Sequence, residues 1–316
     1  MAPPPTSAIA VTGLAKSFGG VPVLSGIDVN VPAGTVFSLL GPNGAGKTTM
    51  VRILATLGAA DRGEVRVAGH DVLREPDAVR RLIGVTGQNS AVDDVLTTAE
   101  NLRLVGNLLH LTGDEISRRT GNLLKRFDLV AAAGKRAGAL SGGTRRRLDL
   151  AMSLMGDPRI LFLDEPTTGL DPRSRRELWA VIRDLVAGGV TIFLTTQYLE
   201  EADQLADRIA VLDGGRIVAE GTPAELKQLV PGGHIRLTFT DTAGLTAASR
   251  LVPAAETDAG ELALRVPSDG SAGQIAGLLG RFADESIAIG ELTIHTPDLD
   301  DVFFALTGAP AGKESR

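Results

Sequence analysis

The stretch Val36-Phe-Ser-Leu-Leu-Gly-Pro-Asn-Gly-Ala-Gly-Lys-Thr-Thr49 decides the fold of this 316-residue chain. Its first five residues form a short apolar run that predicts a buried strand. Residues 41–48 then fit the pattern Gly-x-x-x-x-Gly-Lys-[Ser/Thr] at every required position, which is typical of a phosphate-binding loop. We therefore predict a strand, a loop that wraps phosphate groups, and a helix that begins near Lys47.

The residues of this loop suit the chemistry of a nucleoside triphosphate. Glycines let main-chain N–H groups turn inward, and the positive end of the following helix faces the same concavity. Lys47 can reach the β- and γ-phosphates, and the Thr48 hydroxyl can ligate Mg²⁺. A glycine-rich turn that binds nothing is the alternative, and the register of strand, glycines, lysine and hydroxyl argues against it. The candidate nucleotide contacts are Gly41, Pro42, Asn43, Gly44, Ala45, Gly46, Lys47, Thr48 and Thr49.

Composition excludes several classes of function. A net charge of −6 and a pI near 5.4 imply no broad basic surface, so we expect no nucleic-acid partner. The absence of cysteine excludes disulfides, a thiol nucleophile and cysteine-ligated zinc. No window has the roughly 18 consecutive apolar residues of a membrane helix, and residues 1–8 do not resemble a signal peptide. We expect a chain that is soluble by itself.

Acids and an amide follow two predicted strands. Ile160-Leu-Phe-Leu163 predicts a buried strand, after which paired carboxylates are costly without a cation or hydrogen bonds. Asp164 suits Mg²⁺, and Glu165 suits orienting or deprotonating an attacking water; two solvated acids are the alternative. Gln88 follows the strand that begins at Ile83, where its amide could touch Mg²⁺ or the attacking water. As a lone residue it is more simply a solvated loop amide.

A second helix start suited to a phosphate lies in Leu140-Ser-Gly-Gly-Thr-Arg-Arg-Arg-Leu-Asp-Leu-Ala151. Ser141 fits an N-cap, and Gly142 and Gly143 allow close approach of the backbone. Because the whole chain is acidic, we interpret the arginines at 145–147 as a solvated first-turn face and not as a nucleic-acid patch.

The order of segments predicts two domains. Alternating apolar strands and helices over 36–211 indicate an α/β domain with a largely parallel sheet, whose ligands collect at strand ends. Residues 9–31 predict a small β layer of short strands with turns at Gly13, Gly19-Gly20 and Gly26. Phe18 and Val23 lie on this layer, where Phe18 either stacks on an adenine or is a core residue. A helix-patterned insertion covers about 95–157.

The second predicted domain follows the linker Pro231-Gly232-Gly233. If residues 252–257 form a strand, the order of elements is βαββαβ, a ferredoxin-like α+β arrangement, with a closing helix over 297–307. This region carries no catalytic constellation. The predicted domains are thus 9–230 and 235–307.

Taken together, the motifs in residues 9–229 resemble the ATP-binding subunit of an ABC transporter. The phosphate loop, the Gln88 turn, Leu140-Ser-Gly-Gly, the strand ending in Asp164-Glu165, and Gly169-Leu170-Asp171 occur in the family's order. Val85-Thr-Gly-Gln88, Arg145-Arg-Arg-Leu-Asp-Leu-Ala151 and Thr195-Thr-Gln-Tyr-Leu-Glu-Glu-Ala-Asp203 make it most similar to the daunorubicin/doxorubicin-resistance, drug-export type. Leu299-Asp-Asp-Val-Phe-Phe-Ala-Leu306 resembles part of the small C-terminal domain often attached to those subunits.

The resemblance implies a homodimer arranged head to tail. ATP lies between the phosphate loop of one copy and the Ser141-Gly142-Gly143 helix start of the other, and Asp171 joins the nucleotide-contacting residues. Closure on ATP would drive a separate multispanning permease, gripped by Gln88 and the helical insertion. The resemblance thus implies an ATPase with Mg²⁺ as cofactor, located in the cytoplasm on the inner face of the membrane, that powers export of hydrophobic drugs.

Two residues depart from the family pattern. Thr144 replaces the usual Gln after Ser-Gly-Gly. Gln197 replaces the usual His, and an amide cannot carry a proton as imidazole can. We therefore hypothesise that Glu165 is the sole general base and Gln197 a γ-phosphate sensor.

Two other functions compete with ATP-driven export. One is that of a soluble ABC-type ATPase acting on DNA or ribosomes. The other is that of a regulator that binds ATP without hydrolysing it, and the Asp164-Glu165 pair argues against this second function.

Overall fold

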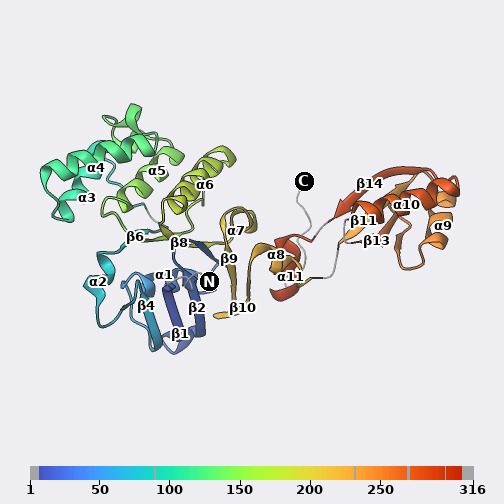
Figure 1. Ribbon diagram of the computed structural model, residues 1–316, viewed down its shortest axis with the longest axis horizontal. Helices are drawn as coiled ribbons and strands as arrows, with labels where there is room; N and C mark the ends of the chain where they lie inside the picture. Colours follow the sequence, from blue (N-terminus) through green and yellow to red (C-terminus); the bar gives the residue numbers. More distant parts are fainter. Residues whose placement is uncertain (1–6, 89, 231–232, 269–270, 296, 308–316) are drawn as a thin grey trace, which may run out of the picture. The chain divides into compact units, whose positions relative to one another are not determined.

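The computed structural model describes residues 7–88, 90–230, 233–268, 271–295 and 297–307 (Figure 1). The chain divides into two compact units, Met1–Pro223 and Ala224–Arg316, and each is described by itself. Residues 231 and 232 of the predicted linker lie outside the described residues. Within the described ranges, no helix is both long and apolar enough to cross a membrane.

The first unit contains an antiparallel sheet in the order β2-β1-β4-β5, formed by β1 (Ser7–Phe18), β2 (Val21–Pro32), β4 (Arg62–Val67) and β5 (His70–Asp71). The predicted short strands are wrong here, because β1 and β2 are each 12 residues long. Gly13 and Gly26 have positive φ angles of 60° and 73° and lie at shifts in the β1–β2 register. They form bulges within long strands, a conformation that glycine permits as readily as a turn.

A six-stranded sheet in the order β10-β9-β3-β8-β7-β6 is the centre of this unit. Its strands β3 (Val36–Leu40), β6 (Ile83–Thr86), β7 (Ile160–Asp164), β8 (Thr191–Thr196) and β9 (Arg208–Asp213) are parallel, and β10 (Arg216–Gly221) is antiparallel at the edge. Every residue of β3, β7 and β8 is buried, as expected for parallel strands covered on both faces. The carboxyl ends of β3, β6, β7 and β8 meet at one edge, where ligands of such sheets bind.

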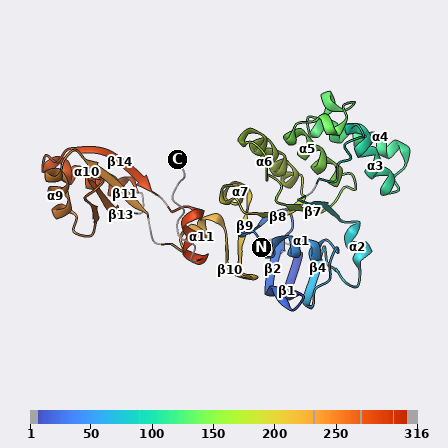
Figure 2. The same cartoon turned by 180° about the vertical axis from the view of Figure 1, so that it is seen from behind.

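Helices cover both faces of this sheet. In both views α1 (Lys47–Leu54) lies on the side of the β1–β2 layer, and α5 (Gly142–Ser153) and α6 (Pro172–Ala187) lie on the other (Figures 1 and 2). Side chains alternate accordingly: Phe162 packs in the core that contains α1, and Leu161 in the core that contains α5 and α6. Outside the helical insertion, this unit also contains α2 (Pro76–Arg80) and α7 (Leu199–Leu205).

The predicted helical insertion contains two helices before α5. These are α3 (Thr98–Leu108), whose cap Thr97 forms a capping box with Glu100, and α4 (Gly113–Arg126), capped by Thr112. His110 lies between them with a positive φ of 55°, a conformation outside the α-helical region, so α3 and α4 are separate helices. The 3₁₀ turns η1 (Val130–Ala132) and η2 (Ala137–Ala139) lead to α5.

The second unit contains an antiparallel sheet in the order β12-β13-β11-β14. Along the chain, β11 (His234–Phe239), α9 (Thr242–Leu251), β12 (Glu256–Asp258), β13 (Ala263–Pro267), α10 (Ala272–Asp284) and β14 (Ile289–His295) follow the order βαββαβ. The strand expected over 252–257 is reduced to the three residues of β12. The helix α11 (Leu299–Thr307) follows the sheet, and α8 (Pro223–Lys227) spans the boundary between the units.

Candidate nucleotide-binding and hydrolysis site

The loop between β3 and α1 requires glycine at two positions. Gly46 has a φ of 110°, and a Cβ atom there would lie 2.8 Å from Leu24 Cδ2 and 2.9 Å from the Val23 carbonyl. A Cβ atom on Gly41 would lie 2.3 Å from the main-chain oxygen of Leu212. Both residues lack the side chain that these contacts forbid, so the backbone can close into the predicted phosphate loop.

Lys47 joins the loop to the acid that follows β7. Its side chain is only 4% exposed, and its Nζ donates to the carbonyls of Gly41 at 2.9 Å and Pro42 at 3.1 Å. The same atom lies 3.1 Å from Glu165 Oε1. The cation and the carboxylate predicted for phosphate binding and water activation therefore face one site.

Asp164 and Glu165 are not the solvated pair of the alternative interpretation. Asp164 is buried at the end of β7, and its Oδ1 accepts a hydrogen bond of 2.5 Å from the Thr195 hydroxyl. The Glu165 side chain is 10% exposed, and its main-chain N–H donates to the Thr195 carbonyl at 3.1 Å. Glu165 also has a φ of 49°, an uncommon backbone conformation outside glycine. Strain of this kind is concentrated at functional sites.

Gln88 reaches the phosphate loop from the end of β6. Its amide Nε2 lies 3.4 Å from the Thr48 hydroxyl, so it is not a loop amide remote from the site. Gln88 and Glu165 line one hollow of about 160 Å³ together with residues of the phosphate loop and Val23. The full lining is Val23, Asn43, Gly44, Gly46, Lys47, Thr48, Thr49, Gln88 and Glu165.

The oxygen atoms near this hollow fit a small divalent cation. Thr48 and Gln88 line the hollow and carry hydroxyl and amide oxygens, and Asp164, directly before Glu165, carries a buried carboxylate; such oxygens are the hard ligands that Mg²⁺ prefers. In the described part of the chain, no group of three or more His, Cys, Asp or Glu residues could hold a metal ion alone. This donor set suits an ion that also binds the phosphates of a nucleotide.

Ser141 caps α5 as predicted from the sequence. Its Oγ accepts a hydrogen bond of 3.3 Å from the N–H of Thr144 and lies 2.9 Å from the Thr144 hydroxyl. Ser141 and Gly142 are exposed. Gly143 packs against α6, because a Cβ atom there would lie 2.5 Å from Ser174 Oγ.

Asp171 has a clear local role as the N-cap of α6. Its carboxylate accepts from the N–H groups of Arg173 and Ser174 at 3.0 Å each, and from the Ser174 hydroxyl at 2.6 Å. The Ser174 hydrogen bonds hold the pKa of Asp171 below its usual value. The cap thus fixes the position of the Ser174 side chain, against which Gly143 packs.

Phe18 and Gln197 lie outside the lining of the 160 Å³ hollow. Phe18 is 57% exposed, with Lys16 Nζ 5.2 Å from its ring centroid, so the core interpretation of this residue is wrong. An exposed ring is available for stacking. Gln197 directly follows β8 and is half-buried, at the same sheet edge as Glu165.

The prediction of a solvated arginine face at 145–147 is wrong. Arg146 is only 11% exposed, and its Nε donates to the Pro166 carbonyl at 2.7 Å. Arg145 pairs with Asp94, and Arg147 lies 3.8 Å from Glu177. A run of arginines is normally solvated, but this helix packs its first two turns against the ends of β6 and β7.

Two buried acids were missed by the sequence analysis. Asp149, 4% exposed, accepts from Arg146 Nη1 at 3.0 Å, and its spacing three residues after Arg146 on an apolar helix face was the available signal. Glu201 is fully buried and accepts from Trp179 Nε1 at 3.1 Å. Burial raises the pKa of both carboxyl groups.

This geometry defines a class of protein. A parallel sheet that places a phosphate loop, a buried lysine and a strand-end glutamate around one hollow is the architecture of a phosphate-binding-loop ATPase. The family model described as ABC transporter matches residues 24–168.

Two curated relatives match nearly the full chain. It is 47% identical over 304 residues to the daunorubicin resistance ATP-binding protein DrrA3 of Streptomyces coeruleorubidus, with 96% of each chain covered. It is 46% identical over 318 residues to the daunorubicin/doxorubicin resistance ATP-binding protein DrrA of Streptomyces peucetius, covering 98% of this chain and 96% of that one. The chain therefore belongs to the family of ABC transporter ATP-binding subunits, and within it to the daunorubicin/doxorubicin-resistance type.

One similar solved structure is dimeric. A dimeric ATP-binding cassette in a post-hydrolysis state, bound to ADP and Pi, aligns with a TM-score of 0.61 and 26% identity, covering 68% of this chain and 98% of that chain. The predicted fold class and family are confirmed, and the chain is the ATP-hydrolysing subunit of a transporter.

Proposed function

We propose that two copies of this chain bind two MgATP between them and that closing and reopening of this homodimer drives drug export through a separate permease. One observation carries the proposal: Lys47 is buried between the phosphate loop and Glu165, whereas the Ser141 helix start is exposed. A second copy would supply the Ser141-Gly142-Gly143 end to the phosphate loop of the first.

In the proposed site the chain's own residues have separate roles. The loop N–H groups and Lys47 hold the β- and γ-phosphates, and Phe18 and Val23 receive the adenine. Thr48, Gln88 and Asp164 would hold Mg²⁺, which neutralises phosphate charge when bound. Glu165 takes the proton of the attacking water, and Gln197 donates to the γ-phosphate. Asp171 acts through the cap that supports the Ser141 helix start.

The substrates and the location follow from the relatives. The two curated relatives are named for resistance to daunorubicin and doxorubicin, so we propose export of hydrophobic drugs of this kind. The chain would act in the cytoplasm, attached to the inner face of the membrane by the permease.

The decisive experiment uses co-expression with a candidate permease in drug-sensitive cells. Wild-type chain with the permease should lower the accumulation of fluorescent doxorubicin, and Glu165→Gln should abolish this effect. Equal accumulation in cells with wild type, variant or no ATPase subunit, at matched expression of the permease, would refute drug export.

A further inference from the structure

The guanidinium of Arg146 connects three segments of the first unit. Its Nη1 donates to the Gly87 carbonyl at 3.0 Å, directly before Gln88. Its Nε donates to the Pro166 carbonyl at 2.7 Å, and its Nη2 lies 3.4 Å from the carbonyls of Asp164 and Glu165. One side chain of α5 therefore holds the main chain on either side of the candidate general base and the segment that carries Gln88.

Asp149 holds this guanidinium from the next turn of α5. One of its carboxylate oxygens accepts from Arg146 Nη1 at 3.0 Å, and the other accepts from the N–H of Ala91 at 3.1 Å. Ala91 lies in the same segment as Gln88. Arg146 and Asp149 therefore each bond to the main chain after β6, at Gly87 and Ala91 respectively. The buried charge of Arg146 also has a buried counter-charge in Asp149.

The position of Arg146 on its helix gives these contacts a functional meaning. Ser141 is the exposed cap of α5, and Arg146 lies five residues after it. A tilt or shift of the helix start would therefore be transmitted by the guanidinium to the carbonyls around Glu165 and to the Gln88 segment. A hollow of about 320 Å³ is lined by Gly142, Arg146, Gln88 and Glu165 among others, so these groups share one surface.

We propose that Arg146, oriented by Asp149, is a positioning residue that couples the two ATP sites of the dimer. The coupling rests on the proposed function, in which Ser141 of one copy contacts the ATP held by its partner. Contact of Ser141 with that nucleotide sets the position of α5, and Arg146 then aligns Glu165 and Gln88 at the chain's own ATP. Hydrolysis at one site thereby depends on occupancy of the other.

The chemistry of this position requires arginine. Four carbonyls and a carboxylate around one group match the planar fork of five N–H donors of a guanidinium, which a lysine ammonium cannot reproduce. Arg146→Lys keeps the positive charge beside Asp149 and loses the fork. Arg146→Met removes both and leaves Asp149 buried without its partner.

The test compares steady-state ATP hydrolysis by the full-length chain with its permease in proteoliposomes. For Arg146→Lys we expect kcat to fall about tenfold or more, the affinity for a fluorescent ATP analogue to change less than about threefold, and the Hill coefficient for ATP to approach 1. Asp149→Asn should show the same pattern with a smaller loss. Unchanged kcat and Hill coefficient in Arg146→Lys would overturn the proposal.

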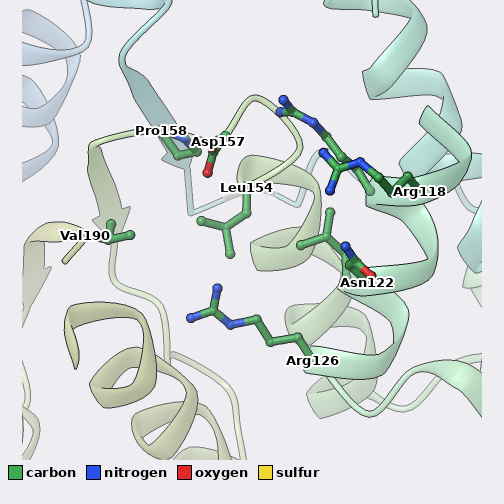
Figure 3. A pocket seen from close by; sticks show the side chains of 9 residues that line it. Arg118, Asn122, Arg126, Leu154, Asp157, Pro158 and Val190 are labelled. Carbon is green, nitrogen blue, oxygen red and sulfur yellow. The ribbon is translucent and has the colours of Figure 1, made fainter. Parts of the chain in front are cut away.

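A matched control is available on the same helical insertion. Arg119 also donates to a main-chain carbonyl, that of Met155 at 2.7 Å, and to a carboxylate, that of Glu115. It lines a different hollow, of about 240 Å³, between α4 and residues 154–158 (Figure 3). Arg119→Met should lose stability without changing the Hill coefficient. If Arg146→Lys and Arg119→Met lower the melting temperature equally and neither changes cooperativity, Arg146 is structural only and the proposal fails.

The same data separate this proposal from the proposed function. A wild-type protein that hydrolyses ATP without cooperativity and without an ATP-dependent dimer would refute the composite site itself. A cooperative wild type with an equally cooperative Arg146→Lys variant would refute only the role of Arg146.

Discussion

The two helix starts that suit phosphate binding, at Lys47 and at Gly142, are built in opposite ways. The start of α1 is enclosed by its own chain: Lys47 is buried and contacts Glu165, and Thr48 is within 3.4 Å of Gln88. The start of α5 is exposed, and among the described residues the hydroxyl of its cap Ser141 bonds only within its own first turn, to Thr144. The first lines a hollow, and the second is an exposed surface.

This difference is what the proposed homodimer requires, since each chain would then supply half of two sites. Around Gly46 a side chain would collide with atoms of the same molecule, whereas a Cβ atom on Gly142 would meet nothing within 4 Å. The first glycine is therefore required by the fold of the chain. The second is required only if something else approaches, which is what the proposed homodimer predicts.

The largest effect is expected from Glu165→Gln. In the proposed function Glu165 accepts the proton of the attacking water, so removal of its carboxylate should lower phosphate release about 10²- to 10⁴-fold. The variant should still bind ATP and accumulate as a dimer, measured by sedimentation velocity with and without nucleotide.

Glu200→Gln is the matched control, since Glu200 is an exposed acid on α7. The roles assigned to the two residues would be reversed if Glu165→Gln retained turnover while Gln197→Ala abolished it. A nucleotide-bound Glu165→Gln variant that stayed monomeric beside its permease would contradict the composite site.

Gly46→Ala should disable the enclosed helix start. The φ of 110° and contacts of 2.8 and 2.9 Å to Leu24 and Val23 are incompatible with alanine, and strain of about 1–3 kcal/mol corresponds to roughly 5- to 150-fold weaker ATP binding. Isothermal titration with ATP at excess Mg²⁺ measures this loss. Binding within twofold of wild type would show that the loop tolerates a side chain.

Gly142→Ala tests the exposed helix start by the same chemical change. Because no atom of the described residues lies within 4 Å of the added methyl, ATP binding to the dilute monomer should be unchanged. Crowding against the partner's nucleotide costs about 1–3 kcal/mol, so ATP-dependent dimerisation should weaken about tenfold. Equal effects of Gly46→Ala and Gly142→Ala on monomer binding would remove the distinction between the two helix starts.

The enclosed half of the site could be predicted from sequence because its information is local. The phosphate loop has fixed spacing, and β3, β7 and β8 are predominantly apolar or threonine-rich strands that are buried in every residue. Asp164 and Glu165 directly follow the apolar residues of β7, so their position at the sheet edge follows from the topology of a parallel sheet.

Residues that act through long-range contacts could not be predicted in this way. In the run at 145–147, only packing of α5 shows that Arg146 turns to carbonyls that follow β6 and β7. Phe18 was equally compatible with core and surface, because register shifts within β1 change which face a residue occupies. The glycines of β1 and β2 specify a positive φ but do not distinguish a bulge from a turn.

The smallest effect is expected at Asp171, whose cap supports the surface beside Gly143. Hydrogen bonds from Ser174 hold the pKa of Asp171 below its ordinary value of 3.8, so the ionised form is favoured in the folded chain. This stabilisation is present above the unfolded pKa and is lost as the pH falls through the lower folded value. Asp171→Ala should therefore lower the melting temperature slightly at pH 7, and the difference from wild type should shrink as the pH approaches 3.

Asp171→Asn separates the cap from its charge, because asparagine caps helices about as well as aspartate. It should keep most of the melting temperature at pH 7 and show a weaker pH dependence than wild type. ATP binding to the monomer should be unchanged in both variants, since the cap belongs to the exposed half of the site. If Asp171→Ala instead weakened monomer binding as strongly as Gly46→Ala, the cap would belong to the enclosed half, and the division between the two helix starts would be wrong.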